Sequence, residues 1–235
     1  MGRLKRLMKE HPKMTKLLIT INNVFQRKGS LGVGTTFVCT GLLQNCRMQI
    51  NGAENKVNIG DACRLQNCII KIRGNNNSVN VNSGCHLIDT EFYIEDDNCN
   101  IIIGNETCIC GKTQLAAIEG CSISIGNHCL FSSEINLRTG DSHAILDMSG
   151  NRINPSKDII IEDHVWIGNR AIILKGVHLE QNTIVATGAV VTKSFPEPNC
   201  VLAGNPAKII RENINWNSDR KNDSLYMEGR SLERI

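Results

Sequence analysis

The sequence has few aromatic residues and no long apolar run. Phe, Trp and Tyr make up 4% of its 235 residues, so small aliphatic side chains must fill the core. No stretch approaches the roughly 20 apolar residues that a membrane-spanning helix needs. The first 28 residues are basic, but they lack the continuous apolar segment and cleavage site of a signal peptide. Arg6 stands where an N-myristoylation signal has Ser or Thr. We therefore expect a cytoplasmic protein.

The chain also lacks a large excess of charge of one sign. It has 26 Lys and Arg against 23 Asp and Glu, a net charge of +3. Proteins that bind nucleic acids usually concentrate basic residues on one face. The charge balance therefore argues against a nucleic-acid partner.

A third absence is the C-x-x-C pair, although the chain has 11 cysteines. Without such pairs a zinc site has little support, and we predict no metal. A chain without a signal peptide is expected to keep its thiols reduced. Because many of the cysteines recur at fixed places in a repeat, we interpret them as small buried core residues.

What the sequence does contain is an internal repeat. Leu43-Gln44-Asn45-Cys46 recurs 22 residues later as Leu65-Gln66-Asn67-Cys68. An aliphatic column keeps the same spacing, and a column of small residues follows it by four positions. The aliphatic column is Ile59, Val81, Ile103 and Ile125, and the small column is Cys63, Cys85, Thr107 and Cys129. Each unit contains three short β-like runs, which indicates a solenoid of stacked coils.

The period shortens to six residues from Ile161 onward. Aliphatic residues stand at every sixth position, and the first five of them are each followed four positions later by a small residue. The aliphatic residues are Ile161, Ile167, Ile173, Leu179, Val185 and Val191. Six residues make one flat strand and one corner, and three such units close a triangular coil. We therefore predict an all-β solenoid, a left-handed parallel β-helix, over residues 29–211. The 22-residue units are then coils with enlarged corners.

Both ends of the predicted solenoid carry appendages. Apolar residues at near-helical spacing, such as Leu4, Leu7, Met14 and Leu18, predict an amphipathic helix within residues 1–28. We interpret this helix as a cap over the first coil. The alternative is membrane-surface binding through its basic residues, which are Lys5, Arg6, Lys9, Lys13 and Lys16. Residues 212–235 are expected to form a peripheral polar tail.

One corner column of the 22-residue repeat ends in a histidine. The corners are Gly74 to Asn77, Asp96 to Cys99, Ile118 to Cys121 and Gly140 to His143. After His143 the repeat breaks, and the composition predicts a loop excursion over residues 140–158. Long excursions from a solenoid commonly carry function. His143 is therefore a candidate general base, and the alternative is a turn histidine bonded to backbone.

The other five histidines are weaker candidates. His86, His128, His164 and His178 occupy non-core positions of the repeat, and His11 lies in the predicted cap. A trimeric β-helix can bind zinc through three histidines between subunits, as γ-class carbonic anhydrases do. The close histidine pair of that family is missing, so we do not favour a zinc site.

The segment from Arg138 to Arg211 resembles the hexapeptide-repeat acetyltransferases. The matching stretches are Arg138 to His143, Ile161 to Gly168, Ala189 to Pro196 and Ala203 to Arg211. Their order and spacing look like the branch that contains galactoside and maltose acetyltransferases and the capsule or polysialic-acid O-acetyltransferases. Asp141-Ser142-His143 and the segment from Asn151 to Pro155 look most like the polysaccharide-modifying members.

The resemblance implies a homotrimer with active sites in the grooves between subunits. It also implies acetyl-CoA as the co-substrate and a glycan as the acceptor. His143 would remove a proton from the acceptor hydroxyl, whose oxygen attacks the thioester directly, so no nucleophilic Ser or Cys is required. The group that orients His143 stays open among Asp141, Asp158 and a backbone carbonyl.

The resemblance also suggests binding residues. Trp166 matches a tryptophan that lines the donor and acceptor pocket, and it should point outward because Val165 points in. A trimer-interface role is its alternative. Asn169 and Thr187 should lie along the arm of CoA, mainly through their backbone. The residues that would meet the nucleotide phosphates are Thr192, Lys193, Lys208 and Arg211, with Lys175 as a further candidate.

Three functional hypotheses follow from these observations. The leading one is an O-acetyltransferase that acts on a capsular or other surface polysaccharide or its precursor. The second is an acetyltransferase for a small molecule, such as an amino sugar, serine or an antibiotic. The third is a non-catalytic β-helix scaffold, which would not bind acetyl-CoA.

Overall fold

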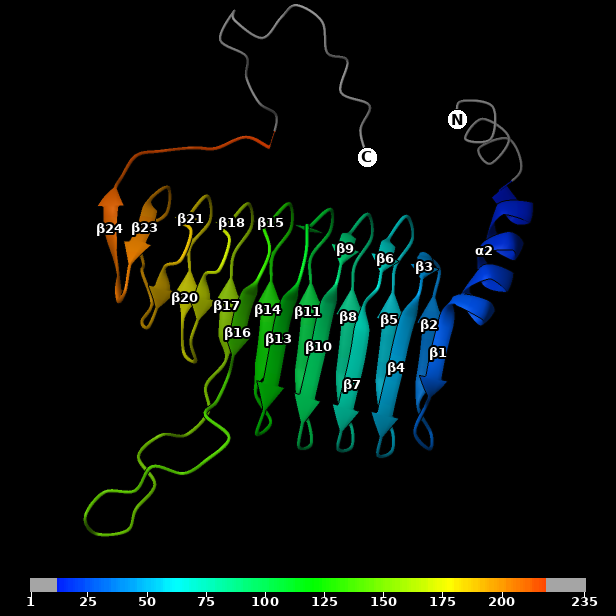
Figure 1. Cartoon of the computed structure of the whole chain (residues 1–235), viewed down its shortest axis with the longest axis horizontal. Helices are drawn as coiled ribbons and strands as arrows, with labels where there is room; N and C mark the ends of the chain where they lie inside the picture. The colour runs from blue at the N-terminus through cyan, green and yellow to red at the C-terminus, as the bar shows by residue number, and fades with distance from the viewer. Residues whose placement is uncertain (1–11, 219–235) are drawn as a thin grey trace, which may run out of the picture.

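The computed structural model describes residues 12–218. They form one helix, α2 (Pro12–Gln26), followed by a β-solenoid whose coils stack along one axis (Figure 1). Its strands form three sheets, one on each side of a triangular prism. The solenoid predicted from the repeats is therefore confirmed, and its first strand begins at Arg27, two residues earlier than expected. No helix within the described residues is long and apolar enough to cross a membrane.

Each coil contributes one strand to each sheet. Sheet 1 consists of β1 (Arg27–Ser30), β4 (Cys46–Asn51), β7 (Ile69–Arg73), β10 (Thr90–Glu95), β13 (Thr113–Ile118), β16 (Ile135–Arg138), β19 (Ile172–Ile173) and β22 (Val190–Val191). Sheet 2 consists of β2 (Thr36–Cys39), β5 (Lys56–Ile59), β8 (Ser78–Val81), β11 (Asn100–Ile103), β14 (Ser122–Ile125), β17 (Ile159–Ile161) and β20 (His178–Leu179). Sheet 3 consists of β3 (Leu42–Gln44), β6 (Arg64–Gln66), β9 (His86–Ile88), β12 (Cys108–Ile109), β15 (Leu130–Phe131), β18 (Trp166–Ile167), β21 (Ile184–Val185), β23 (Val201–Gly204) and β24 (Ala207–Arg211). Only the last pair, β23 with β24, is antiparallel among these strands. We call the corners between consecutive sheets the 1–2, 2–3 and 3–1 edges.

The wide and narrow coils differ mainly at one edge. From sheet 1 to sheet 2, Ile70 and Val81 are separated by 11 positions in the sequence, whereas the equivalent Ile173 and Leu179 are separated by six. From sheet 2 to sheet 3 both kinds of coil take six. The sheet 1 strands shorten accordingly, from six residues in β13 to two in β19. The extra length of the 22-residue coils therefore lies in sheet 1 and the 1–2 edge.

The interior combines aliphatic side chains with free thiols. All 11 cysteines are free and seven of them are buried, so the interpretation as core residues holds for these seven. Members of the small-residue column donate hydrogen bonds to carbonyl oxygens of the next coil. The pairs are Cys63 to Asn82 (2.8 Å), Cys85 to Gly104 (3.0 Å) and Thr107 to Gly126 (2.8 Å). Cys and Thr share this column because both are small and carry one donor.

The 1–2 edge of the wide coils contains a buried amide ladder. The Oδ1 atom of Asn55 accepts a hydrogen bond from the backbone N of Asn77 (3.0 Å), and Asn77 Oδ1 accepts one from the backbone N of Cys99 (2.8 Å). Their Nδ2 groups donate to the carbonyls of Gly74 and Asp96, both at 3.0 Å. The two asparagines are at most 1% exposed. Each amide therefore satisfies backbone groups that would otherwise be buried without partners.

Helix α2 covers the open side of β3, the first strand of sheet 3, with polar side chains. The Nδ2 group of Asn23 donates to Gly41 O (2.8 Å), and its Oδ1 accepts from Leu43 N (2.9 Å). Asn22 Nδ2 donates to Leu43 O (2.9 Å). These amides replace the missing neighbouring strand, which blunts an exposed sheet edge. The predicted cap is therefore present.

The residues that predicted the helix are not the ones that make this contact. Met14, Leu17, Leu18 and Ile21 are 47–59% exposed. Other members of the predicted stripe, including Leu4 and Leu7, lie outside the described residues, as do Lys5, Arg6 and Lys9. In the part that the structure describes, the apolar stripe therefore faces solvent, and the helix covers the first coil through its polar side.

Candidate active site

The predicted excursion is a loop that leaves the 1–2 edge between β16 and β17 and projects away from the coils (Figure 1). Asn154, 7% exposed, ties its two ends together. Its Nδ2 group donates to the carbonyl of His143 (2.8 Å) and to Asp141 Oδ2 (2.8 Å). Its Oδ1 atom accepts from the backbone N of Ile145 (2.6 Å). The amide thus fixes the backbone on both sides of His143.

Two ion pairs hold the loop against the coils. Arg152 Nη2 lies 2.8 Å from Glu119 Oε1, and Lys175 Nζ lies 2.5 Å from Asp141 Oδ2. The guanidinium of Arg152 lowers the pKa of Glu119, and the ammonium of Lys175 lowers the pKa of Asp141. Both carboxylates are therefore charged at neutral pH, and the loop is fastened to the coils before and after it.

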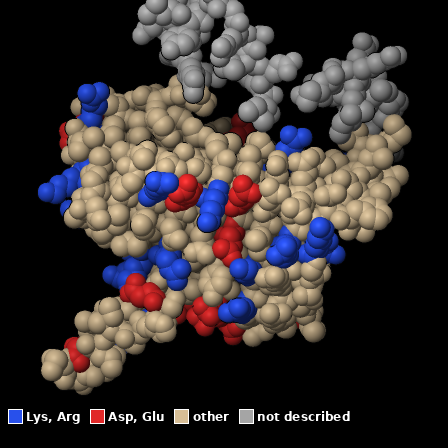
Figure 2. Space-filling view, viewed as in Figure 1, with Lys and Arg blue, Asp and Glu red and all other residues tan. Residues whose placement is uncertain are grey.

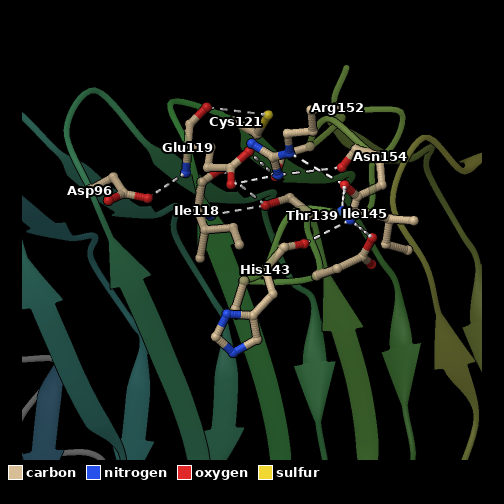
Figure 3. A network of polar contacts seen from close by, with 12 residues as sticks. Asp96, Ile118, Glu119, Cys121, Thr139, His143, Ile145, Arg152 and Asn154 are labelled. Carbon is tan, nitrogen blue, oxygen red and sulfur yellow. Dashed lines mark hydrogen bonds and ion pairs between the residues drawn. The ribbon is translucent and has the colours of Figure 1, made fainter. Parts of the chain in front are cut away.

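The imidazole of His143 is exposed and points away from this network, as Figure 3 shows. It borders an open cavity of about 720 Å³ lined by Glu95, Asp96, Ile118, Glu119, Ser142, His143 and Arg152. Within residues 12–218 neither ring nitrogen has a hydrogen-bond partner. Of the proposed orienting groups, Asp141 is engaged with Lys175 and Asn154, and Asp158 Oδ1 accepts from Ser122 N (2.7 Å). Within the described residues none of the three proposed orienting groups contacts the ring.

Trp166 lies on the outer face of sheet 3, as predicted, and is 38% exposed. A second tryptophan packs beside it. The ring of Trp216 lies 5.9 Å from that of Trp166 at 45°, and it stacks on His164 at 4.2 Å and 5°. Trp216 Nε1 donates to His164 O (2.8 Å). The described part of the tail, residues 212–218, therefore returns over sheet 3 and builds an aromatic wall beside Trp166.

One chain does not bring His143 and Trp166 together. His143 belongs to the 1–2 edge, and Trp166 belongs to sheet 3. In a triangular prism the edge between two faces lies opposite the third face. The two side chains of one chain therefore point to opposite sides of the solenoid.

The remaining candidates fall into the same two groups. Lys175 and Lys193 lie on the 1–2 edge, one and two coils beyond His143. Thr192 is next to Lys193. The second group lies on sheet 3 or the 3–1 edge and consists of Asn169, Thr187, Lys208 and Arg211. Each group forms a row along the solenoid axis.

The candidates differ in how free their side chains are. Thr187, Thr192, Lys193, Lys208 and Arg211 are exposed. The Nδ2 group of Asn169 donates to Ser133 O (2.8 Å), so this side chain is engaged within the coils. The ammonium of Lys175 is held by Asp141 and by Asn154 O (3.0 Å), so it fastens the loop. Gly204, Asn205 and Pro206 form a turn with a cis Asn205–Pro206 bond, and Lys208 follows it on β24.

The histidines of the zinc alternative have separate partners. His164 Nδ1 bonds to Asn182 Oδ1 (2.8 Å), and His178 Nε2 donates to Glu162 Oε1 (2.9 Å). Neither bonds to His143. No group of three or more His, Cys, Asp or Glu side chains within residues 12–218 is placed to hold a metal ion.

The narrow coils match the family model of the bacterial transferase hexapeptide (six repeats) over residues 158–193. The solved structure of the polysialic acid O-acetyltransferase OatWY has 33% sequence identity and a TM-score of 0.79, over 84% of this chain and 94% of that chain. The structure of the polySia-specific acetyltransferase NeuO has 34% identity and a TM-score of 0.72, over 84% and 89%. The chain therefore belongs to the hexapeptide-repeat acetyltransferase family, and the predicted left-handed β-helix is confirmed.

A curated relative points to the same group of proteins. The polysialic acid O-acetyltransferase of Escherichia coli O1:K1 is 43% identical over 89 residues. That match covers 37% of this chain and 29% of the relative.

Two residues of the site escaped the sequence analysis. Asn154 falls within the predicted loop and the matching segment from Asn151 to Pro155, but no role was predicted for it, although it is the amide that fixes the backbone around His143. Trp216 lies 52 residues from His164 in sequence, outside the repeat, so no periodicity connects it to Trp166. A lone tryptophan in a polar tail was the one available signal.

Proposed function

We propose that the protein transfers the acetyl group of acetyl-CoA to a hydroxyl of a capsular polysaccharide. The observation that supports this most strongly is the likeness, at 33% identity, to the polysialic acid O-acetyltransferase OatWY over 94% of that chain. Because acetyl-CoA is made inside the cell, we place the reaction in the cytoplasm. The acceptor would be the polymer or its precursor.

In this proposal His143 is the general base. Its exposed imidazole borders the open cavity, within reach of an incoming hydroxyl. The ring takes the hydroxyl proton while the oxygen attacks the thioester carbonyl, and the protonated ring can then return the proton to the departing thiolate. Acetyl-CoA supplies the acetyl group as a reactive thioester. Asn154 and the two ion pairs of the loop hold the backbone that carries the imidazole, which favours reaction by orientation.

We further propose that a site is shared between two subunits of a homotrimer. The row of candidates that includes His143, on the 1–2 edge of one subunit, would face sheet 3 of its neighbour. That sheet carries the aromatic wall and the basic residues Lys208 and Arg211. This pairing supplies what one chain lacks, since His143 and Trp166 point to opposite sides. Lys193, Lys208 and Arg211 are exposed cations suited to the phosphates of CoA.

Activity on a panel of acceptors tests the proposed function. The full-length chain would be incubated with acetyl-CoA and, separately, polysialic acid, a neutral capsular polysaccharide, an amino sugar and serine. We expect a mass increase of one acetyl group per modified residue on a polysaccharide. Acetylation of a small molecule alone would contradict the choice of acceptor, and failure to bind CoA in a thermal-shift assay would favour the scaffold alternative.

Mixed trimers test the shared site. His143→Ala and Trp166→Ala chains, each inactive or weak alone, would be co-expressed with different tags and purified as mixed assemblies. A shared site predicts partial recovery of activity, because some sites then combine an intact His143 with an intact Trp166. A site within one chain predicts no recovery, since every chain carries one defect.

A further inference from the structure

Helix α2 turns its apolar side to solvent, whereas an ordinary surface helix turns its apolar side to the protein. At 3.6 residues per turn, Met14, Leu17, Leu18, Ile21, Val24 and Phe25 fall within an arc of about 120°. All six are exposed, between 47% and 74%. Asn23, which bonds to β3, lies on the opposite side and is 7% exposed. The polar side of the helix therefore faces the solenoid, and its apolar side faces away.

An apolar stripe of this size is unusual on a protein surface and normally marks an interaction site. The helix does not depend on the stripe for attachment, because amide hydrogen bonds from Asn22, Asn23 and Gln26 fasten it to the first coil. In Figure 1 α2 stands at the end of the solenoid, far from the loop that carries His143. The stripe is therefore separate from the proposed active site.

The charge around the stripe indicates what covers it. Residues 1–28 carry eight basic side chains and one acidic side chain, Glu10. The rest of the chain then has 18 basic against 22 acidic residues, a net charge of −4. On the face shown in Figure 2, both signs are interspersed along the solenoid. The chain is thus polarised, with a cationic apolar end and a weakly anionic body.

We propose that the N-terminal segment docks the protein onto an anionic lipid bilayer, with the apolar face of α2 buried among the acyl chains near the headgroups. A helix with an apolar face and flanking Lys and Arg residues has this behaviour. Anionic headgroups attract the cationic end and repel the anionic body, so the solenoid axis points away from the membrane. A second copy is a poorer occupant, because two strongly cationic segments repel each other.

Vesicle binding by the full-length chain tests the proposal. We expect sedimentation with vesicles that contain phosphatidylglycerol, weaker binding at high salt, and little binding to phosphatidylcholine alone. Leu18→Glu places a charge in the stripe, and Thr20→Glu places the same charge on the exposed flank of the same helix. We expect at least a tenfold loss of binding for Leu18→Glu and no more than about a fivefold loss for Thr20→Glu.

Other outcomes would overturn the proposal. No binding to anionic vesicles at low salt would exclude a lipid surface. Equal losses in the two variants would show attraction by charge without insertion of the apolar face. A larger assembly in solution that Leu18→Glu disperses, without vesicle binding, would make a second copy the occupant. Phe25→Glu repeats the test at another position of the stripe, and thermal unfolding checks that each variant is folded.

Discussion

The wide coils and the narrow coils build the same prism with different chemistry. In the wide coils, equivalent positions of sheets 1 and 2 are separated by 11 residues in the sequence. The 1–2 edge of these coils contains the buried amides of Asn55 and Asn77. The narrow coils separate these positions by six residues, and the buried residue of their edge is the aliphatic Val177. The longer backbone of the wide edge is therefore satisfied in part by buried side-chain amides, whereas at the narrow edge Gly176 N donates to Asp158 O of the preceding coil.

The coil width changes at the proposed site. Where the wide coils end, sheet 1 becomes shorter and the 1–2 edge recedes. The loop with His143 leaves the solenoid at this change of coil width. The cavity beside His143 is lined by Glu95, Asp96 and Ile118 from wide coils and by Ser142 and Arg152 from the loop. The cavity beside His143 therefore lies where the wide and the narrow coils meet, and most of the residues proposed to bind CoA belong to the narrow coils beyond it.

The largest effect is expected from a substitution of His143, where the wide coils meet the narrow coils. His143→Ala should lower acetyl transfer by roughly 100-fold or more, because it removes a general base without touching the interior of either coil type. Binding of CoA, measured by thermal shift, should be unchanged. Full activity in this variant would end the assignment of the base, and loss of CoA binding would mean that the two rows of candidates are not separate.

The second prediction concerns stability in the wide coils. Asn77→Ala leaves Cys99 N and Asp96 O buried without the partners they have now, which should cost about 1–3 kcal/mol of unfolding free energy. Activity of the folded variant should be unchanged. Asn80→Ala removes an amide that is half-buried on the outer side of sheet 2, and it should cost no more than about 0.5 kcal/mol. Equal stability of the two variants in urea unfolding would refute the role of the ladder.

The repeat-based features were predictable from the sequence, and the contacts made outside the repeat were not. A column such as Cys63, Cys85 and Thr107 is visible because stacking forces equivalent positions to have similar size. The pairing of Trp216 with Trp166 leaves no period, and neither does the engagement of Lys175 with Asp141. Sequence spacing also revealed that helix α2 has an apolar side, but not which way that side faces. The direction is set by the hydrogen bonds of Asn22 and Asn23 to the first coil. In the sequence these two residues cannot be distinguished from ordinary polar surface residues.

The third prediction concerns the aromatic wall on sheet 3. Trp166→Ala should lower kcat/KM about tenfold, because an aromatic surface for the ligand is lost. Trp216→Ala should have a smaller effect of the same kind, since Trp216 packs beside Trp166. Trp216→Phe keeps an aromatic ring but loses the hydrogen bond to His164 O, so it separates the two contributions. Steady-state kinetics that are unchanged in both alanine variants would remove sheet 3 from the site.

The fourth prediction compares two lysines on the 1–2 edge. Lys193→Met should raise the KM for acetyl-CoA up to about fivefold, because one exposed charge contact to phosphate is lost. Lys175→Met should instead lower kcat with little change in that KM, because Lys175 fastens the loop through Asp141. The same loop contact gives a pH dependence. Lys175 holds the pKa of Asp141 below its usual value near 3.9, so the contact persists at neutral pH and is lost only as the pH falls through that lowered pKa. A raised KM in both variants would assign Lys175 to the ligand.

The smallest effect is expected from the one exposed thiol. Cys108 and Cys110 lie on the outer face of sheet 3 with their Sγ atoms 3.7 Å apart, and Cys110 is exposed. A hydrogen bond from the Cys108 thiol lowers the pKa of Cys110 to about 7, so its thiolate forms as the pH rises through neutrality. Alkylation should therefore label one cysteine rapidly, with a rate that rises steeply around pH 7, and leave the seven buried thiols unlabelled until the chain unfolds. Because the side chain of Cys110 is exposed, labelling it should leave the folded stability of the wide coils unchanged. Rapid labelling of Cys63 or Cys85 in the native protein would show that the wide coils open locally, and it would contradict the view that their thiols are core residues.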